Sequence, residues 1–543
     1  MGAVSVPAAD RGEQAAGKTA LRTSESLWLP GLVLVVNLAA ALYLSYKIQY
    51  VEADAVSRVA SAYYVLFSGD PHLGAIGFIW NPLPSLMELP LVLLKPLFPA
   101  LAVRALAGCF VTALFGALGV RQLLGLLTGF GIDRRYRILA AICYALNPLI
   151  LLYSSNGMSD IILMTSYLGA IRGVLAYLDG RSLRPLMEAA LWLVVAFGAR
   201  YEAIPFTAFL VLGLLYAVSR TRSLREAEGA SILLAAPVVY AASIWMYVNW
   251  LIMKNPLYFL VSPYGNIAQV ATGAYATPAL SWAYHSILHT VLYTAHFSLL
   301  YWPVWVGIAA ALYWTLKRKN GDPRGAVLLA ALVGELSLEM AMTYHGSIAS
   351  WDRFYMDYIV MGFALVAFAA SKLLSIRKDQ RALLLAGMVV LMALGDVGTW
   401  QAMQVPFLSN PDGVTIDQAL TGSPLPTTNG ARFQVSPVAT YLNAHPHLVV
   451  LADSFDSYNV ILQVRNPHQL VITSDEDFAG ILHNPLGRVN AILVPRPQGV
   501  ATLNAINFTY PRMWRGRVRW TYLMESFHDA ARMRLYGVKD TAP

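Results

Sequence analysis

The stretch LWLPGLVLVVNLAAALYLSY at residues 27–46 contains no charged residue, and KIQYVE at 47–52 follows it directly. A helix needs about 20 apolar residues to cross the ~30 Å hydrocarbon core of a bilayer. Because no small-residue cleavage site follows, we predict a retained membrane span and not a signal peptide. The same bias extends over all 543 residues, of which 57% are hydrophobic and 13% charged, with a mean hydropathy of +0.52. These values predict an α-helical polytopic membrane protein.

Ten further apolar stretches bring the expected number of transmembrane helices to eleven. They lie near residues 103–126, 138–154, 161–178, 186–199, 203–219, 230–252, 289–316, 325–343, 355–375 and 382–400. Their lengths suit membrane helices and not barrel strands, which excludes a porin. Cys109 and Cys143 lie inside such stretches, so we expect packing roles for both and no disulfide or cysteine zinc site.

The distribution of Lys and Arg predicts how the chain is oriented. Segment 82–98 is apolar but carries Glu88, Lys95 and four prolines. If it does not span, about nineteen Lys and Arg share the side of the N-terminus against about seven opposite, in agreement with the positive-inside rule. We therefore place 82–98 flat on the outer leaflet of the plasma membrane. Residues 1–26 then form a disordered cytoplasmic tail, 47–102 is the first outer loop, and the C-terminus lies outside.

The composition changes after about residue 400. Residues 27–400 are predicted as the membrane domain, 401–435 as a linker and 436–543 as an extracytoplasmic domain. In the last part, apolar runs typical of strands alternate with helical patterns, which predicts an α/β fold. The runs are at 447–453, 469–473 and 490–495, and the helical patterns at 437–444 and 477–483. Residues 401–543 hold 11 basic and 10 acidic residues, and no basic stripe occurs elsewhere, so nucleic acid is excluded as a partner.

The most informative polar stretch is YVEADAVSRVASAYY at 50–64, directly after the first span. Glu52 and Asp54 lie where the chain leaves the bilayer, and a carboxylate there can remove a proton from an acceptor hydroxyl. Acids that merely end a span are the alternative interpretation. The predicted topology brings further polar residues to the same face, in the outer loops and at the outer ends of spans. The full candidate set is Glu52, Asp54, Arg58, His72, Asp160, Arg200, Tyr201, Glu202, His345 and Arg353.

In these residues the chain resembles the GT-C superfamily of polytopic glycosyltransferases, which includes protein O-mannosyltransferases and the aminoarabinose transferases of lipid A. The shared features are an acid in a long first outer loop, a Pro-Leu turn in that loop, an acid in the second outer loop, an Arg-Tyr-Glu motif and an appended outer domain. They correspond here to Glu52 or Asp54, Pro82-Leu83, Asp160, residues 200–202 and 436–543. The resemblance covers residues 27–400 as architecture, through motifs of a few residues each.

The resemblance implies inverting transfer of a sugar from a polyprenyl-phosphate donor to a hydroxyl of a glycan, lipid or protein acceptor. Asp54 is expected to be the general base, with Glu52 and Asp160 orienting the acceptor or holding a divalent cation such as Mg²⁺ or Mn²⁺. Arg200 and Arg353 are expected to bind the phosphate, because a guanidinium matches phosphate oxygens in a two-pronged manner and stays charged.

The remaining candidates, Arg58, His72, Tyr201, Glu202 and His345, are expected to contact substrate. Arg200 pairing with Glu202, and Arg353 pairing with Asp352, stay open as structural alternatives. No metal-binding motif is present, so the metal requirement also stays open.

Two other classes of function compete with a transferase. A secondary transporter or lipid flippase would use Glu335, Glu339 and Arg172 inside the predicted spans as pathway residues. The odd number of spans, the absence of a visible repeat and the gathering of polar residues at one face count against it. The other alternative is a catalytically inactive scaffold of the same fold.

Overall fold

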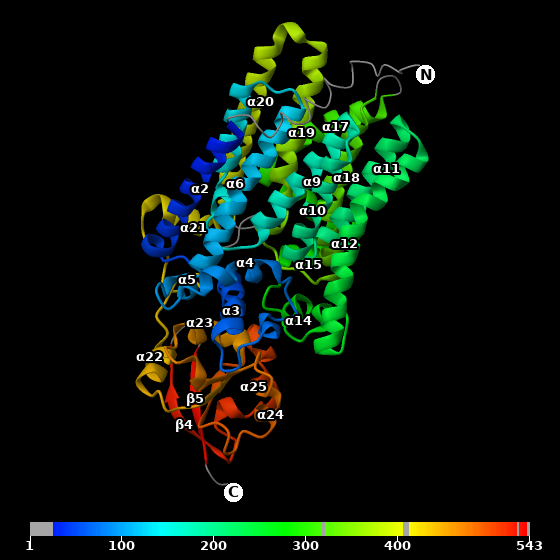
Figure 1. The fold of residues 1–543 in the computed structure, drawn as a ribbon. Coiled ribbons are helices and arrows are strands. Elements are labelled where there is room, and N and C mark those ends of the chain that lie inside the picture. The colour runs from blue at the N-terminus through cyan, green and yellow to red at the C-terminus, as the bar shows by residue number, and fades with distance from the viewer. Residues whose placement is uncertain (1–24, 318–320, 406–411, 529–531, 540–543) are drawn as a thin grey trace, which may run out of the picture.

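The computed structural model describes residues 25–317, 321–405, 412–528 and 532–539. Most of these residues form a long helical bundle, and a small α/β domain lies at one end of it (Figure 1). The tail predicted at 1–26 falls outside the described residues apart from Glu25 and Ser26, which begin the first helix. The predicted class, a helical polytopic membrane protein with a C-terminal α/β domain, is confirmed.

Eight helices in the described part of the chain are long and apolar enough to cross a bilayer. They are α2 (Glu25–Tyr43), α6 (Leu106–Gly129), α9 (Asp160–Gly180), α11 (Ala203–Thr221), α12 (Leu224–Met253), α18 (Pro323–His345), α19 (Asp357–Ile376) and α20 (Arg381–Met403). A bent pair, α16 (Ile287–His296) and α17 (Val304–Leu316), would make a ninth span. Its two parts meet at 110° near Pro303, a residue that cannot continue the hydrogen-bond ladder of a helix.

Eight or nine of the eleven predicted spans thus meet both length and composition. The stretch at 138–154 is two short helices, α7 (Arg134–Leu146) and α8 (Pro148–Tyr153), because Pro148 ends the ladder and Asn147 caps the second helix. The stretch at 186–199 is α10 (Leu183–Ala199), whose 17 residues are about 25 Å long at ~1.5 Å per residue.

The first outer loop is built of short helices, α3 (Ala53–Phe67), α4 (Leu83–Val92) and α5 (Ala100–Val103), which lie between the bundle and the α/β domain (Figure 1). Helix α4 has 10 residues and is too short to cross a bilayer, so it does not span, as predicted for 82–98. It begins at Leu83 with Pro84 in its first turn, a position where the missing N–H of proline costs nothing.

The basic loops meet at the end of the bundle that is remote from the α/β domain (Figure 1). There Glu25 pairs with Arg137 at 2.5 Å, and Asp133 pairs with Arg381 at 2.7 Å. Because each pair joins segments more than a hundred residues apart, these loops share one end of the molecule, as the sequence predicts. That this end is cytoplasmic stays a prediction.

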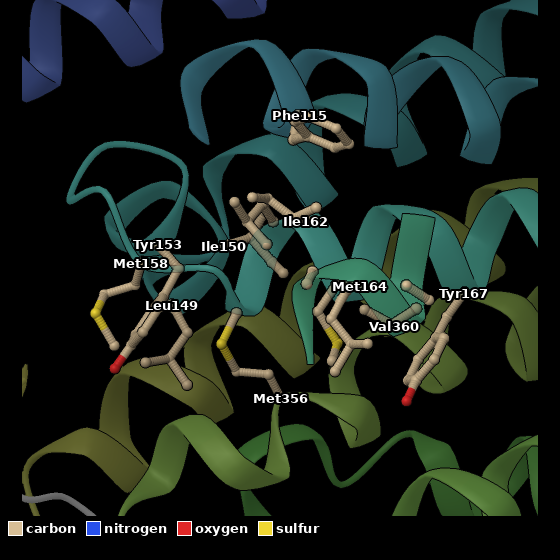
Figure 2. Close-up of a cluster of buried hydrophobic side chains, with 14 of the residues drawn as sticks. Phe115, Leu149, Ile150, Tyr153, Met158, Ile162, Met164, Tyr167, Met356 and Val360 are labelled. Atoms are coloured by element: carbon tan, nitrogen blue, oxygen red, sulfur yellow. The ribbon is translucent and has the colours of Figure 1, made fainter. Parts of the chain in front are cut away.

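The core of the bundle lies where α6, α8, α9 and α19 meet, and Figure 2 shows part of it. Large apolar side chains from these four helices interdigitate there, among them Phe115, Ile150, Ile162 and Val360, each at most 7% exposed. Met158 lies on the loop that leads into α9, so this core also supports the segment before Asp160.

The C-terminal domain has one five-stranded sheet with strand order β2-β1-β3-β5-β4. Strands β1 (Val450–Ala452), β2 (Leu470–Ile472) and β3 (Ala491–Pro495) are parallel, and all three were predicted from their apolar runs. The predicted helices appear as α22 (Pro437–Ala444) and α24 (Phe478–His483). Two helices and an antiparallel hairpin escaped prediction: α23 (Ser454–Gln463), α25 (Ala505–Thr509), β4 (Thr521–Ser526) and β5 (Met533–Val538).

Two connecting segments complete the architecture. The outer loop 253–288 contains α13 (Tyr258–Val261), α14 (Asn266–Ala271) and α15 (Pro278–Ala283). The segment predicted as a linker at 401–435 contains the end of α20 and a further helix, α21 (Asp412–Thr421). After α21, residues 425–433 hydrogen-bond to the chain just before α3, for example from Val51 N to Ala431 O at 2.8 Å. The linker is thus fastened to the membrane domain.

Candidate functional site

The candidate site is centred on the first turn of α3. Glu52 has an extended backbone and immediately precedes this helix, and Asp54 lies in its first turn, where a negative charge suits the positive end of the helix dipole. The Tyr50 hydroxyl donates to Glu52 Oε2 at 3.3 Å. Helix α3, which begins at these carboxylates, lies between the bundle and the α/β domain (Figure 1).

Asp54 forms an ion pair with Arg353, a residue 299 positions away in the chain. Arg353 Nη2 donates to Asp54 Oδ2 at 2.9 Å, and the side chains are 8% and 35% exposed, respectively. The guanidinium also lies over the ring of Trp351 at 4.3 Å and donates from Nη1 to Met158 Sδ at 3.7 Å. Asp54 is thus partly exposed to solvent, while Arg353 is fixed by its contacts with Trp351 and Met158.

A second cluster joins Asp160, Arg200 and Glu202. Arg200 Nη1 donates to Asp160 Oδ1 at 2.9 Å, and its Nε and Nη2 donate to Glu202 Oε1 at 2.9 and 2.5 Å. Arg200 has an extended backbone between α10 and α11, which turns its side chain out of both helices. The predicted pairing of Arg200 with Glu202 is therefore present, and Asp160 shares the same cation.

The close approach of the second outer loop to α3 depends on Gly157. Its φ of +85° lies in the positive region that favours glycine. A Cβ at this position would lie 3.0 Å from Ala55 Cβ and 3.3 Å from Cys109 N. Glycine therefore lets this loop bring Asp160 to the start of α3 and toward Asp54.

Arg58 contributes a third guanidinium, one helical turn after Asp54. It is buried, and its Nε and Nη1 make no hydrogen bond within the part of the chain that the structure describes. The guanidinium lies 5.3 Å from the ring centre of Trp80 and interacts electrostatically with Asp54 and Asp160. Buried donors without a partner are costly, and they can be satisfied by an anionic ligand.

Three other predicted site residues lie away from this centre or play a packing role. Tyr201 donates to Ile79 O at 3.1 Å and accepts from Trp245 Nε1 at 3.0 Å, so it ties the first loop to α12. The ring of His72 hydrogen-bonds to Asp70 O at 2.8 Å, and Asp70 in turn accepts from a backbone N–H of the α/β domain. His345 is exposed at the end of α18 and is not brought to Asp54.

A set of polar residues lies behind Arg353, of which Asp412 and Tyr153 were not predicted and Asp352 was considered as a partner of Arg353. The backbone N–H of Arg353 donates to Asp352 Oδ1 at 2.9 Å, and the Asp352 side chain is hydrogen-bonded to that of Asp412 in α21. Asp412 also accepts from the Tyr153 hydroxyl at 2.7 Å. Asp412 and Tyr153 are 259 residues apart, so only the folded chain reveals this set.

The two carboxylates at α3 have opposite pKa shifts. Burial raises the pKa of Glu52 to about 7, although the positive charge of Arg353 acts in the opposite direction. Burial also acts to raise the pKa of Asp54, but the charge and hydrogen bond of Arg353 outweigh it and hold this pKa below its usual value. Near neutral pH, Asp54 is therefore ionised and Glu52 is close to its titration point.

The described residues show no ready set of ligands for the divalent cation that the resemblance implies. Asp54 and Asp160 each direct an oxygen at a guanidinium, and in the described residues no three His, Cys, Asp or Glu lie close enough together to hold a metal ion. The cation stays a prediction from the resemblance.

Arg172, one of the three residues named for a transport pathway, does not interact with the other two, Glu335 and Glu339, in the described contacts. Arg172 donates to Gln122 Oε1 at 2.8 Å and to Glu188 Oε2 at 3.1 Å. Glu335 and Glu339 are buried on α18, where they interact electrostatically with Asp357 of α19. The described partners of Arg172 thus lie on other helices than these two glutamates.

This arrangement defines a class of protein, a polytopic membrane protein whose charged centre lies between the bundle and the α/β domain. Its fold is similar to that of ArnT from Cupriavidus metallidurans, solved bound to undecaprenyl phosphate, with a TM-score of 0.52 at 12% identity over 95% of this chain and 98% of that one. The predicted architecture, a polytopic helical membrane domain with an appended α/β domain, is thus shared with a solved structure.

Archaeal oligosaccharyltransferase AglB from Archaeoglobus fulgidus, solved with an inhibitory peptide and a dolichol-phosphate, is also similar, with a TM-score of 0.44 at 12% identity over 96% of this chain and 75% of that one. No protein-family profile matches the sequence, and no curated protein matches it. The similarity is therefore one of fold.

Proposed function

We propose that this protein is a membrane glycosyltransferase that moves a sugar from a polyprenyl-phosphate donor to an acceptor hydroxyl, with inversion at the sugar. Transfer takes place at the α3 centre, on the outer side of the membrane. The observation that carries the proposal is the ion pair of Asp54 and Arg353, because it places a carboxylate and a buried cation side by side at the end of an apolar bundle.

The guanidiniums supply the binding site for the donor phosphate. Arg353 Nε and two nitrogens of Arg58 are buried without a hydrogen-bond partner in the described chain. A phosphate accepts charge-assisted hydrogen bonds from such donors, and these strengthen as negative charge develops on the leaving group. Arg200 adds positive charge near Asp160. The apolar helices place these residues next to a bilayer, and a prenyl chain can reach them from there.

Asp54 is the general base in this proposal. Arg353 keeps it ionised, and its partial exposure lets an acceptor hydroxyl approach within hydrogen-bond distance. When the donor phosphate binds Arg353, the cation is shared between two anions, and Asp54 becomes a stronger base. Glu52 and Asp160 accept hydrogen bonds from the other hydroxyls of the acceptor, which holds the attacking oxygen in line.

Lipid binding tests the proposal without knowledge of the sugar or the acceptor. Native mass spectrometry of the purified protein should show undecaprenyl phosphate bound more tightly than undecaprenol, which lacks the phosphate. Arg353→Gln should weaken the binding of undecaprenyl phosphate by about tenfold or more, since a hydrogen bond to a charged group contributes about 1.5–3 kcal/mol. Arg381→Gln, at the opposite end of the bundle, is the matched control and should bind as the wild type does.

Two results would contradict the proposal. One is equal binding of undecaprenyl phosphate and undecaprenol. The other is an equal loss in the Arg353→Gln and Arg381→Gln variants, which would indicate a non-specific effect of charge.

A further inference from the structure

Charge is unevenly distributed within the C-terminal domain. From residue 496 to 534 the sequence has seven arginines against two acids, Glu525 and Asp529. From 436 to 495 the balance is reversed, with five acids against two arginines. The near neutrality of the whole region therefore conceals a basic half, which coincides with the end of β3, the segment that follows it and the β4–β5 hairpin.

Most of these arginines have no anionic partner. In the described part of the domain, six of the seven form no ion pair with a carboxylate. They are Arg496, Arg512, Arg515, Arg517, Arg519 and Arg534. Arg534 donates from Nη1 to Trp514 O at 2.6 Å, and its guanidinium lies 4.4 Å from the centre of the Trp514 ring. It is held in place while its charge stays uncompensated.

Two adjoining cavities lie among these residues. One has a volume of about 280 Å³ and is lined by Arg496, Arg532, Arg534, Trp514 and Phe527 among others. The other has a volume of about 470 Å³ and shares Arg496 and Arg532 with the first. We call the two together the arginine cleft. Its size is that of a small-ligand site, and its walls combine guanidiniums with aromatic rings.

The arginine cleft lies at the edge of the sheet that faces the membrane domain. Pro495 at the end of β3 is paired with Met533 at the start of β5, and the parallel strands all end at this edge. A Cβ on Gly499 would lie 3.7 Å from Ala274 in the outer loop 253–288. The cleft thus adjoins the loop that connects α12 to the next span.

Helix α23 connects the cleft to the candidate site. Asp456 of this helix lines the larger cavity, and Tyr458, two residues further on, interacts electrostatically with Asp54 and Glu52. The same helix contacts α3 (Figure 1). A chain-like ligand held in the cleft can therefore extend along α23 toward Asp54.

We propose that the arginine cleft binds an anionic saccharide, a sugar chain that carries carboxylate or phosphate groups, and that it presents this saccharide to the α3 centre as acceptor. Guanidiniums match both anions in a two-pronged manner, and the half-buried Trp514 offers an apolar contact for a sugar ring. This inference rests on the proposed function and adds the chemical class of the acceptor.

Binding of defined oligosaccharides to the full-length protein in detergent tests the inference. Isothermal titration should show binding of hexagalacturonate, which carries carboxylates, and none of maltohexaose, which is neutral. Arg496→Gln should weaken the binding of hexagalacturonate by about tenfold, and Arg496→Lys should weaken its binding less because the charge is kept. The Arg496 side chain makes no hydrogen bond and no ion pair in the described chain, so its replacement should leave the fold intact.

The matched control is Arg465→Gln together with Arg488→Gln, two exposed arginines of the acidic half. This variant loses more charge and should bind hexagalacturonate as the wild type does. Equal weakening in the control and in Arg496→Gln would overturn the inference, as would equal binding of the two oligosaccharides. Binding to phosphatidylglycerol vesicles but not to hexagalacturonate would also overturn it, in favour of a lipid surface.

The outcome is distinguishable from failure of the proposed function. If purified protein releases the carrier lipid from a donor but does not bind hexagalacturonate, only the inference about the acceptor fails. If it binds hexagalacturonate through Arg496 but neither binds undecaprenyl phosphate nor releases it from a donor, only the proposed transfer fails.

Discussion

Glu52 and Asp54 are two residues apart, yet their surroundings differ in one decisive partner. Arg353 donates directly to Asp54, whereas Glu52 has the neutral Tyr50 hydroxyl as its hydrogen-bond donor. Burial therefore prevails at Glu52 and raises its pKa to about 7, while the cation prevails at Asp54. Asp54 is therefore ionised throughout the neutral range, whereas Glu52 becomes ionised as the pH rises through about 7.

The first prediction concerns Glu52→Gln. Because the pKa of Glu52 is about 7, its carboxylate is protonated below that pH and can no longer accept two hydrogen bonds from an acceptor. Sugar transfer by the wild type should rise with pH through an inflection near this value. In Glu52→Gln the rate should be lower and the inflection absent. The measurement is the initial rate of carrier release between about pH 5.5 and pH 8.5.

Asp54 adds no inflection in this range, because its pKa is below the usual value and it stays ionised throughout. An inflection that persists unchanged in Glu52→Gln would assign the titration to another group. The isosteric change preserves the volume of the side chain, so the comparison isolates its charge.

Individual residues of the site differ in how far they could be predicted. Glu52 and Asp54 were recognisable because they follow a span directly, and Asp160, Arg200 and Glu202 because they end spans on the same face. The pairing of Asp54 with Arg353 could not be predicted, since it joins positions 299 apart through tertiary packing. His72 and His345 were predicted from their position in outer loops, but neither lies close to Asp54. Residues on one membrane face can be far apart, so a shared face does not define a site.

At the level of elements, α21 is more than a part of a linker. Its first residue, Asp412, is buried and links Tyr153 of α8 to Asp352, which in turn accepts from the backbone of Arg353. Three segments thus determine where the guanidinium lies. We expect α21 to position Arg353 through this contact.

The second prediction is that Asp412→Ala lowers kcat by about tenfold or more, because loss of a buried hydrogen-bond partner costs about 1–3 kcal/mol and frees the segment that carries Arg353. Asp412→Asn should recover most of the rate, since an amide can still accept from Tyr153 and donate to Asp352. Steady-state kinetics of carrier release provides kcat and KM for each variant.

Asp417→Asn on the same helix is the control, because Asp417 bonds only to Gln404 at an exposed position. A purely structural role of Asp412 would lower the thermal midpoint of both Asp412 variants without recovery of kcat by Asn. That result would remove α21 from the site.

The elements themselves follow from periodicity and composition where both are strong. The long apolar helices and the three parallel strands were predicted, whereas the break at Asn147-Pro148 divided one expected span in two. The β4–β5 hairpin escaped prediction because its strands are interrupted by charged residues, such as Glu525 and Arg534, and alternate poorly.

On the scale of the whole molecule, the structure has one basic end and one end that carries the site and the α/β domain (Figure 1). The positive-inside rule predicted this division from the loops alone, because each crossing reverses the side of the chain. Nine of the eleven predicted spans correspond to apolar helices of sufficient length, if the bent pair of α16 and α17 is taken as one span, and the count of eleven stays a prediction.

The third prediction concerns orientation. Arg135 lies exposed at the basic end, and Arg465 lies exposed in the α/β domain. In intact cells, a membrane-impermeant maleimide should label Arg465→Cys at once and Arg135→Cys only after the membrane is permeabilised. Cys109 and Cys143 are replaced by Ala in both variants to remove background labelling. Immediate labelling at position 135 with protection at 465 would reverse the topology.

The most direct measurement of the central claim, transfer from a polyprenyl phosphate at Asp54, is release of the carrier lipid. Purified wild type, with a panel of undecaprenyl-phosphate sugars and an acceptor extract, should form undecaprenyl phosphate detectable by mass spectrometry. Asp54→Asn should reduce the rate by about 10²–10⁴-fold, the contribution of a general base, while undecaprenyl phosphate still binds. Unchanged release by Asp54→Asn would contradict the account.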